Sequence, residues 1–329
     1  MTSFPVTAST LSATALCKLV KEKYQLTEDF KCLLYRTGIN HTYFIKNKHN
    51  TYVLRVYCYN WRTKQEILEE LKLLELLKDN QHSVSYALTD KNKNFIQQIQ
   101  APEGIRYAVL FSFAEGGKVR FLDHQTTFAI GALMGEIHNT TVNKTIARVN
   151  YTTETLTTKP YSFTLKYFDA KLPEMKYIRE VGKKVEVAFK NKKIPEGIIH
   201  LDIWYDNMAI TDNRKITIFD FDFCGNGYLV LDVAYFCAQL FHIETDKEAY
   251  KLKIKEFLKG YQTKTKLSKT EIDLIPIAAT AVWLFYLGVQ SQRFDWSNIF
   301  LTENYLKMYL GRLKNWMNFC EENPNTFTL

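Results

Sequence analysis

Residues of the types that bind metal ions and move protons flank a short hairpin-like sequence. In chain order they are His200, Asp202, Asn207, Asp220 and Asp222. Apolar runs at 208–211 and 215–219 stand on either side of the turn-forming sequence Thr-Asp-Asn-Arg. Such a pattern predicts a β-hairpin. Because a hairpin brings its two ends together, we expect the oxygen-bearing side chains to converge at one mouth.

This arrangement suits the transfer of a phosphoryl group. The phosphates of a nucleotide need magnesium, which prefers a few hard oxygen ligands, with water and phosphate oxygens completing its octahedron. The acceptor hydroxyl needs a carboxylate that orients it and takes its proton. Asp202 can serve the acceptor, while Asn207 and Asp220 hold the metal. In the alternative interpretation these Asp and Asn residues only cap turns, as such residues often do.

The spacing of these residues resembles that of a known superfamily. His-x-Asp, an Asn five residues later, and Asp-Phe-Asp after a short hairpin match the catalytic loop and metal-binding segment of kinases. Stretches 200–207 and 218–222 resemble the aminoglycoside phosphotransferase, choline kinase and homoserine kinase superfamily. Asp222 and the Leu-Asp-Val-Ala at 231–234 favour this branch over ordinary protein kinases. The resemblance covers most of the chain, but only this stretch is specific.

The resemblance implies an α+β class and a two-lobed protein-kinase-like fold, with a small β-rich N-lobe and a mostly helical C-lobe. The expected N-lobe elements are helices at 9–24 and 62–78 and strands near 30–35, 42–47, 51–58, 84–88, 94–99 and 106–113. The expected C-lobe helices lie near 123–140, across 160–190, and near 229–243, 246–262, 270–289 and 298–319. We therefore expect a nucleotide-binding N-lobe at 1–112 and a C-lobe at 113–329 with the catalytic loop and the acceptor-binding helices.

Arg55 stands where the resemblance places a strand lysine that grips the nucleotide's phosphates. Its apolar neighbours would face one side of the sheet and Arg55 the other. Arginine binds phosphate oxygens through its planar fork and keeps its charge. Glu66, Glu69 and Glu70 of the following helix are candidate partners, and Glu70 best matches the family's position. In the alternative interpretation, Arg55 is a solvent-exposed residue of an edge strand.

Further nucleotide contacts follow from the resemblance. The stretch 38–43 resembles the nucleotide-covering loop of the antibiotic kinases, although Gly38 is the one glycine where protein kinases have three. Its backbone amides can cradle phosphate, and Asn40 or Thr42 can add a donor. Phe111 and Phe113 would border the adenine through backbone groups. The expected cofactors are ATP and Mg²⁺, and backbone contacts of this kind leave GTP open.

Two further residues are expected to be structural. In the family the histidine at position 200 braces the catalytic loop through hydrogen bonds. An Asp that opens an apolar helix, here Asp232, caps the helix or anchors a loop. Leu201 and the Ile-Trp-Tyr-Asp at 203–206 depart from the family, which commonly has Gly-Asp after the histidine and a small or Pro-rich segment before the asparagine.

The acceptor pocket is expected between the catalytic loop and the late helices. Its candidate residues are Trp204, Tyr205, Asp206, Trp283, Tyr286, Arg293, Asp295 and Trp296. Aromatic and acidic groups together can hold a cationic amine, but aromatics in a helical lobe are more commonly core residues. The mixed charges of the last helices argue against a polycationic antibiotic and leave homoserine-like, sugar and amino-alcohol acceptors open.

Three functions are compatible with the sequence. The first is an ATP-dependent kinase that transfers the γ-phosphoryl group to a hydroxyl of a small molecule, such as an amino alcohol, homoserine, a sugar or an antibiotic. The second is a Ser/Thr protein kinase of the bacterial stress-response type, from the same superfamily. The third is a nucleotide-binding scaffold without turnover, which Arg55 and the unusual 203–206 segment motivate. Retention of Asp202, Asn207 and Asp220 weighs against the scaffold.

Composition narrows the remaining classes. The 329 residues are 46% hydrophobic and 24% charged, typical of a globular protein, and the net charge of +8 suits an anionic partner such as a nucleotide. No long basic run supports nucleic-acid binding. The six cysteines lack disulfide-like spacing, and the N-terminus lacks a signal-peptide pattern, so we expect reduced thiols and a cytoplasmic protein. The apolar stretch 274–289 falls short of the ~18–20 residues that span a bilayer, which predicts a buried helix and no membrane contact. The oligomeric state is unknown.

Overall fold

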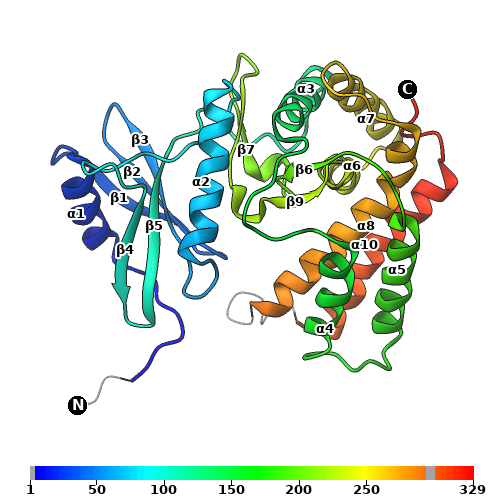
Figure 1. The fold of residues 1–329 in the computed structure, drawn as a ribbon, viewed down its shortest axis with the longest axis horizontal. Helices are drawn as coiled ribbons and strands as arrows, with labels where there is room; N and C mark the ends of the chain where they lie inside the picture. Colours follow the sequence, from blue (N-terminus) through cyan, green and yellow to red (C-terminus); the bar gives the residue numbers. More distant parts are fainter. Residues whose placement is uncertain (1–3, 294–300) are drawn as a thin grey trace. The chain divides into compact units, whose positions relative to one another are not determined.

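The chain folds into two compact units, each of which is described separately below. The computed structural model describes residues 4–293 and 301–329. Unit 1 comprises Met1–Asp79 and Val84–Ala114, and unit 2 comprises Asn80–Ser83 and Glu115–Leu329. Strands predominate in the first unit and helices in the second (Figure 1). The expected α+β class is confirmed, whereas the assignment of nucleotide binding to one unit and acceptor binding to the other stays a prediction.

Unit 1 is an antiparallel sheet with strand order β1-β2-β3-β5-β4. Its strands are β1 (Lys31–Arg36), β2 (His41–Lys46), β3 (Thr51–Val56), β4 (Ile96–Ala101) and β5 (Gly104–Ser112). Helix α1 (Ala13–Tyr24) packs Leu16 and Val20 against one sheet face, where Leu54 and Val56 are fully buried. Helix α2 (Lys64–Asp79) follows β3. Side chains alternate along a strand, so Arg55 points to the face opposite α1.

The expected strand near 84–88 is wrong. Ala87 forms only an isolated bridge with Phe111, although the amide of Leu88 donates to Leu110 O at 2.8 Å. The physical reason is competition for one edge of β5. Strand β4 pairs with β5 as far as Val109, so the last residues of β5 alone are left for this segment.

Unit 2 is mostly helical. Its helices are α3 (His124–Thr141), α4 (Lys159–Thr164), α5 (Pro173–Phe189), α6 (Val230–Ile243), α7 (Lys247–Gln262), α8 (Lys269–Gln292) and α10 (Glu303–Glu322). Two small sheets accompany them, β6 (Glu196–Ile199) with β9 (Gly225–Tyr228), and β7 (Met208–Ile210) with β8 (Ile216–Ile218). The predicted hairpin is confirmed as β7–β8. The β6–β9 pair is a feature that the sequence interpretation missed.

Helices α3 and α7 pack unusually closely, and glycines make this possible. A Cβ atom on Gly131 would lie 2.0 Å from the carbonyl oxygen of Phe257, and one on Gly260 would lie 2.0 Å from that of Phe128. Real Cβ atoms do not approach backbone at such distances, so both positions exclude a side chain. The close approach brings Tyr261 of α7 to His138 of α3, a contact that matters for the catalytic loop.

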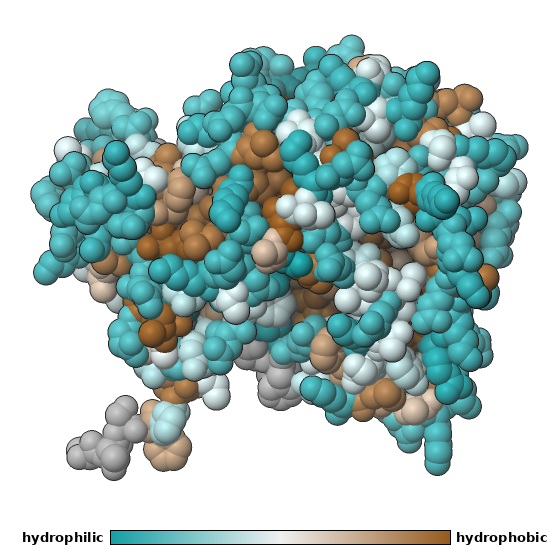
Figure 2. All heavy atoms as spheres, viewed as in Figure 1, coloured by the Kyte–Doolittle hydropathy of each residue, from teal (hydrophilic) through white to brown (hydrophobic). Residues whose placement is uncertain are grey.

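Helix α8 is a core helix of unit 2. Within the described part of the chain it is the one helix whose length and apolar composition would suffice to cross a membrane, yet 67% of its most apolar window is buried inside the protein. Its burial agrees with the buried helix expected over 274–289, although α8 itself is longer than that stretch. On the face drawn in Figure 2, hydrophilic side chains cover most of the surface over α3 and α7 of unit 2. All six cysteines lie in the described residues, and none forms a disulfide.

Candidate active site

The β7–β8 hairpin brings its two ends together as expected. Strands β7 and β8 pair in antiparallel register from Met208 opposite Ile218 to Ile210 opposite Ile216. Beyond the last pair, the amide of Phe219 donates to the carbonyl of Asn207 at 3.0 Å. This bond fixes the residue before Asp220 against Asn207, so the two sides of the mouth are adjacent.

Asp202 lies in the same place and is held by two side chains. The amide Nδ2 of Asn207 donates to Asp202 Oδ2 at 2.7 Å and to its carbonyl oxygen at 3.0 Å. The hydroxyl of Tyr235, on α6, donates to Asp202 Oδ1 at 3.0 Å. Burial, followed by the nearby charge of Asp220, raises the pKa of Asp202 to about 8. Such a carboxyl group can take up a proton near neutral pH.

Asp220 adopts a left-handed backbone conformation, with φ 66° and ψ 63°. Residues other than glycine seldom adopt it, and those that do concentrate at functional sites. A short 3-10 turn (Phe221–Phe223) follows at once and contains the buried Asp222. The guanidinium of Arg148 donates to the carbonyl of Asp222. The contact with Arg148 was not predicted from the sequence, because this residue lies 74 residues upstream in an irregular segment.

His200 braces the catalytic loop, as expected. The amide of Asp202 donates to His200 Nδ1 at 3.1 Å, so Nε2 carries the ring proton and donates to the carbonyl of Phe219 at 3.1 Å. Burial lowers the pKa of His200, which favours this neutral tautomer. The ring thus joins the start of the loop to the residue before Asp220.

The side chain of Asp232 anchors the start of the same loop. Its carboxylate accepts the amide of His200 at 2.9 Å and the amide of Leu201 at 2.6 Å. His138 contacts Asp232 Oδ2 through Nε2 at 3.1 Å and the hydroxyl of Tyr261 through Nδ1 at 2.7 Å. Leu201 has φ 65°, and the two bonds to Asp232 hold the chain in this unfavourable conformation. The expected structural role of Asp232 is confirmed as a loop anchor.

In unit 1, Arg55 and Glu70 form the expected pair. Arg55 Nη1 lies 2.9 Å from Glu70 Oε1, and Glu70 is fully buried. The guanidinium carbon lies 5.2 Å from the ring centre of Phe111. The alternative partners are engaged elsewhere: Glu66 accepts the amide of Thr63 at the start of α2, and Glu69 pairs with the side chain of Lys72. Because β3 is the central strand of the sheet, the edge-strand interpretation of Arg55 is wrong.

The other residues predicted to contact the nucleotide lie in the same unit. Asn40 accepts the amide of Cys58 through Oδ1 at 3.3 Å, which ties the bend before β2 to the residues just after β3. A Cβ atom on Gly38 would meet only the carbonyl of Asn40 at 3.7 Å, so space does not require glycine there. Phe113 is 40% exposed, and its ring stands edge-on to Phe44 at 5.9 Å. These contacts leave the nucleotide-binding roles as predictions.

The acceptor candidates at 204–206 contact one another and another residue of unit 2, Lys118. The rings of Trp204 and Tyr205 meet edge to face with centroids 4.8 Å apart. Asp206 pairs with Lys118, whose Nζ lies 2.5 Å from its carboxylate. The ion pair reduces the charge that Asp206 can offer to a cationic acceptor.

The acceptor candidates on and after α8 differ in what they contact and in how deeply they are buried. Tyr286 donates to the carbonyl of Leu201 at 3.3 Å, and its ring stacks on Tyr235 at 5.4 Å, so it borders Asp202. Trp283 is a buried core residue, only 6% exposed, as the core interpretation of such aromatics expects. Arg293 is buried as well. Asp295 and Trp296 lie outside the described residues.

Residues 36–265, well over half of the chain, match the model of the phosphotransferase enzyme family. The chain belongs to this family. It is therefore an enzyme of the phosphotransferase class, and the scaffold interpretation is not favoured. The superfamily resemblance that the catalytic loop indicated is confirmed.

Relatives of this phosphotransferase share modest identity. An uncharacterised protein of Synechocystis sp. is 27% identical, over 95% of this chain and 87% of its own length. The homoserine kinase of Bartonella henselae is 27% identical, over 59% of this chain and 60% of its own. In that case the alignment leaves two fifths of each protein unmatched.

Solved structures share the fold of the phosphotransferase. Amicoumacin kinase in complex with AMP-PNP, Ca²⁺ and Ami matches with a TM-score of 0.76 at 18% identity, over 94% of both chains. A microcompartment-associated aminopropanol kinase matches with a TM-score of 0.75 at 15% identity, over 96% of this chain and 99% of the other. At these identities the likeness concerns the fold, and it confirms the kinase-like fold expected from the sequence.

The donor atoms at the hairpin mouth of the phosphotransferase fit a hard cation. Because Asn207 Nδ2 donates to Asp202, the amide oxygen is the atom of Asn207 that remains for a metal. No group of three or more His, Cys, Asp and Glu side chains gathers as a metal site among the described residues. Asn207, Asp220 and Asp222 carry oxygen atoms of the kind that Mg²⁺ prefers, and water and phosphate oxygens commonly complete its shell.

A separate cavity of about 630 Å³ lies elsewhere in unit 2. Its walls come from β6, β9, the end of α5 and residues 150–153, and the stacked rings of Phe189 and Tyr228 form one side. The described residues that line it include none of the predicted site residues. The cavity is therefore distinct from the hairpin mouth.

Proposed function

We propose that the protein transfers the γ-phosphoryl group of ATP, bound with Mg²⁺, to a hydroxyl of a small molecule. The observation that carries the proposal is the grouping of Asp202, Asn207 and Asp220 at the end of one hairpin. The family supplies the reaction class, phosphoryl transfer. A homoserine kinase among the relatives and an aminopropanol kinase among the structural neighbours are named for small-molecule acceptors, which favours an acceptor of that size over a protein.

Asp202 is proposed to orient the acceptor hydroxyl and take its proton. A general base works best when its pKa lies near the working pH, and the pKa of Asp202 is raised to about 8. Tyr235 and Asn207 each donate to one of its oxygens, which limits rotation of the carboxylate. The acceptor oxygen can then approach in a fixed direction, which is a large part of catalysis in phosphoryl transfer.

Asn207, Asp220 and Asp222 are proposed to hold the metal, and Arg55 the phosphates. Bound Mg²⁺ would neutralise charge on the phosphate oxygens. The amide oxygen of Asn207 faces away from Asp202, which supports its use as a ligand. The guanidinium of Arg55 is fixed by Glu70 and keeps its charge at any physiological pH.

The test is an acceptor screen that monitors ADP release from ATP and Mg²⁺. Aminopropanol, homoserine, choline, sugars, aminoglycosides and a protein extract serve as acceptors. We expect one small-molecule class to stimulate release, and Asp202→Asn to lower the stimulated rate about 10²–10⁴-fold while nucleotide binding persists. Stimulation by the protein extract alone, or full turnover by Asp202→Asn, would contradict the proposal.

A further inference from the structure

We propose that Tyr57 is a positioning residue for phosphate binding: its hydroxyl holds Glu70 so that Glu70 fixes the orientation of the Arg55 guanidinium. The inference rests on the proposed function, because it takes Arg55 as the group that grips the nucleotide's phosphates. It adds a third residue to that pair, and the sequence pattern did not point to it.

The two oxygens of Glu70 have different partners. Oε1 lies 2.9 Å from Arg55 Nη1, and Oε2 accepts the hydroxyl of Tyr57 at 3.1 Å. Arg55 and Tyr57 are two residues apart along an extended chain, so their side chains point to the same face of the sheet. Arg55 Cζ lies 5.8 Å from the ring centre of Tyr57 and 5.2 Å from that of Phe111. The guanidinium thus contacts the Glu70 carboxylate and lies beside two aromatic rings.

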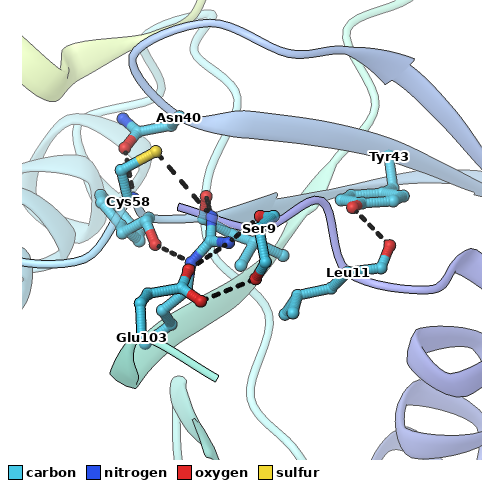
Figure 3. Close-up of polar contacts among 9 residues, drawn as sticks. Ser9, Leu11, Asn40, Tyr43, Cys58 and Glu103 are labelled. Carbon is cyan, nitrogen blue, oxygen red and sulfur yellow. Dashed lines mark hydrogen bonds and ion pairs between the residues drawn. The ribbon is translucent and has the colours of Figure 1, made fainter. Parts of the chain in front are cut away.

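The backbone of Tyr57 is fixed by a buried network. Its amide donates to the carbonyl of Tyr107 at 2.8 Å, and its carbonyl accepts Arg106 Nε at 2.8 Å. Arg106 is only 1% exposed, and its guanidinium also donates to the carbonyl of Ser9 and pairs with Glu103. Ser9 in turn donates to Glu103 at 2.7 Å (Figure 3). The backbone just after β3 is therefore fixed, and this fixes the place at which the Tyr57 hydroxyl meets Glu70.

An arginine needs this second anchor more than a lysine would. A lysine ammonium is a compact charge that works in many orientations, whereas the planar guanidinium fork must be aligned with phosphate oxygens. The terminal torsion of a glutamate is soft. A donor on Oε2 restrains that torsion, so that Oε1, and with it the Arg55 plane, keeps one direction. An arginine at position 55 thus gives the Tyr57–Glu70 bond a use that a lysine there would need less.

The decisive experiment compares binding of AMP-PNP with Mg²⁺ to binding of adenosine, by calorimetry, in single variants. Tyr57→Phe should weaken AMP-PNP binding roughly 10-fold, as expected for one lost hydrogen bond to a charged group, and leave adenosine binding unchanged. The matched control is Tyr43→Phe. That tyrosine is also fully buried in the sheet, but its hydroxyl donates to the carbonyl of Leu11, at 2.8 Å (Figure 3).

A second readout separates positioning from a loss of structure. In an Arg55→Lys background the additional Tyr57→Phe change should cost AMP-PNP affinity less than 3-fold (about 0.6 kcal/mol), because an ammonium tolerates misalignment. Equal losses in both backgrounds, or equal effects of Tyr57→Phe and Tyr43→Phe on AMP-PNP binding, would overturn the inference. Thermal unfolding of every variant shows whether unit 1 remains folded.

Failure of the inference is distinguishable from failure of the proposed function. If Arg55→Ala abolishes the preference for AMP-PNP over adenosine while Tyr57→Phe retains it, Tyr57 is not a positioning residue and the proposed function stands. If Arg55→Ala retains the preference, the phosphate-binding role of Arg55 is wrong, and the inference falls with it.

Discussion

Asp202 combines a position suited to catalysis with a cost to stability. Burial and the charge of Asp220 raise its pKa from 3.8 to about 8. An acid whose pKa is higher in the folded than in the unfolded chain contributes stability that is fully present below the unfolded pKa. That contribution is lost as the pH rises through the folded pKa. Without bound nucleotide and metal, ionisation of Asp202 therefore weakens the fold between about pH 4 and 8.

We predict that Asp202→Asn raises the unfolding free energy of the nucleotide-free protein above that of the wild type, and that this gain is larger at pH 8 than at pH 5. Asparagine does not ionise and keeps the shape of the side chain. The gain at pH 8 is expected to lie between about 1 and 5 kcal/mol, from 1.36 kcal/mol per pKa unit. Urea unfolding at both pH values measures it. A gain that is the same at pH 5 and pH 8 would refute the pKa assignment.

Tyr235 contacts Asp202 and was not predicted from the sequence, although it lies three positions after Asp232 on the same helix. We predict that Tyr235→Phe lowers kcat roughly 10-fold and leaves the KM for ATP unchanged, because one donor to Asp202 is lost. Steady-state kinetics with the acceptor found in the screen tests this. Tyr250→Phe, which removes an equally buried hydroxyl bonded to the carbonyl of Cys237, is the control. Equal kcat losses in both would point to general loosening of unit 2.

At the scale of elements, the contact between α3 and α7 supports the catalytic loop. The close packing at Gly131 and Gly260 lets Tyr261 reach His138, and His138 contacts the carboxylate that anchors Leu201. The chemistry of the loop thus depends on two helices that contribute no side chain to the hairpin mouth. Substitutions that disturb the packing of α3 against α7 should therefore lower stability and activity together.

We predict that Gly260→Ala destabilises the protein by about 2–4 kcal/mol, because the new methyl group would lie 2.0 Å from the carbonyl of Phe128. Gly311→Ala, in the middle of α10, meets nothing within 4 Å and should stabilise by about 0.5–1 kcal/mol. Both values come from denaturant unfolding. A neutral Gly260→Ala would mean that α3 and α7 can separate at little cost.

The sequence predicted elements where local signals were strong. The β7–β8 hairpin follows from turn residues between apolar runs, whereas the choice of Glu70 over Glu66 and Glu69 came from the family resemblance. The β6–β9 pair was missed because Gly225 and Gly227 give a four-residue strand no apolar pattern. His138 contacts Asp232 from 94 residues away, and no local pattern encodes a contact of that kind. The sequence therefore predicted the hairpin and the Arg55–Glu70 pair better than the long-range contacts that hold the loop.

At the scale of the whole molecule, the predicted site residues are divided between the two units. Arg55 and Glu70 belong to unit 1, and Asp202, Asn207 and Asp220 to unit 2. Because each unit holds residues of the predicted set, nucleotide binding as proposed should stabilise each unit against unfolding.

We predict that ATP with Mg²⁺ at about 100 times its Kd stabilises the protein by ~2.7 kcal/mol, as mass action requires. EDTA should remove most of this gain, and Asp220→Ala should remove the part that depends on Mg²⁺. Thermal unfolding followed separately by probes in each unit measures it. Full stabilisation of Asp220→Ala by ATP with Mg²⁺ would exclude Asp220 as a metal ligand.

The left-handed backbone of Leu201 bears on how such enzymes are recognised. A φ of 65° is a conformation that glycine adopts without steric cost, and the fully buried leucine side chain offsets the strain by its packing. A search pattern that insists on glycine after the histidine would pass over this chain. A pattern that asks instead for an aspartate 32 residues beyond the histidine, where the anchor lies, would retain it.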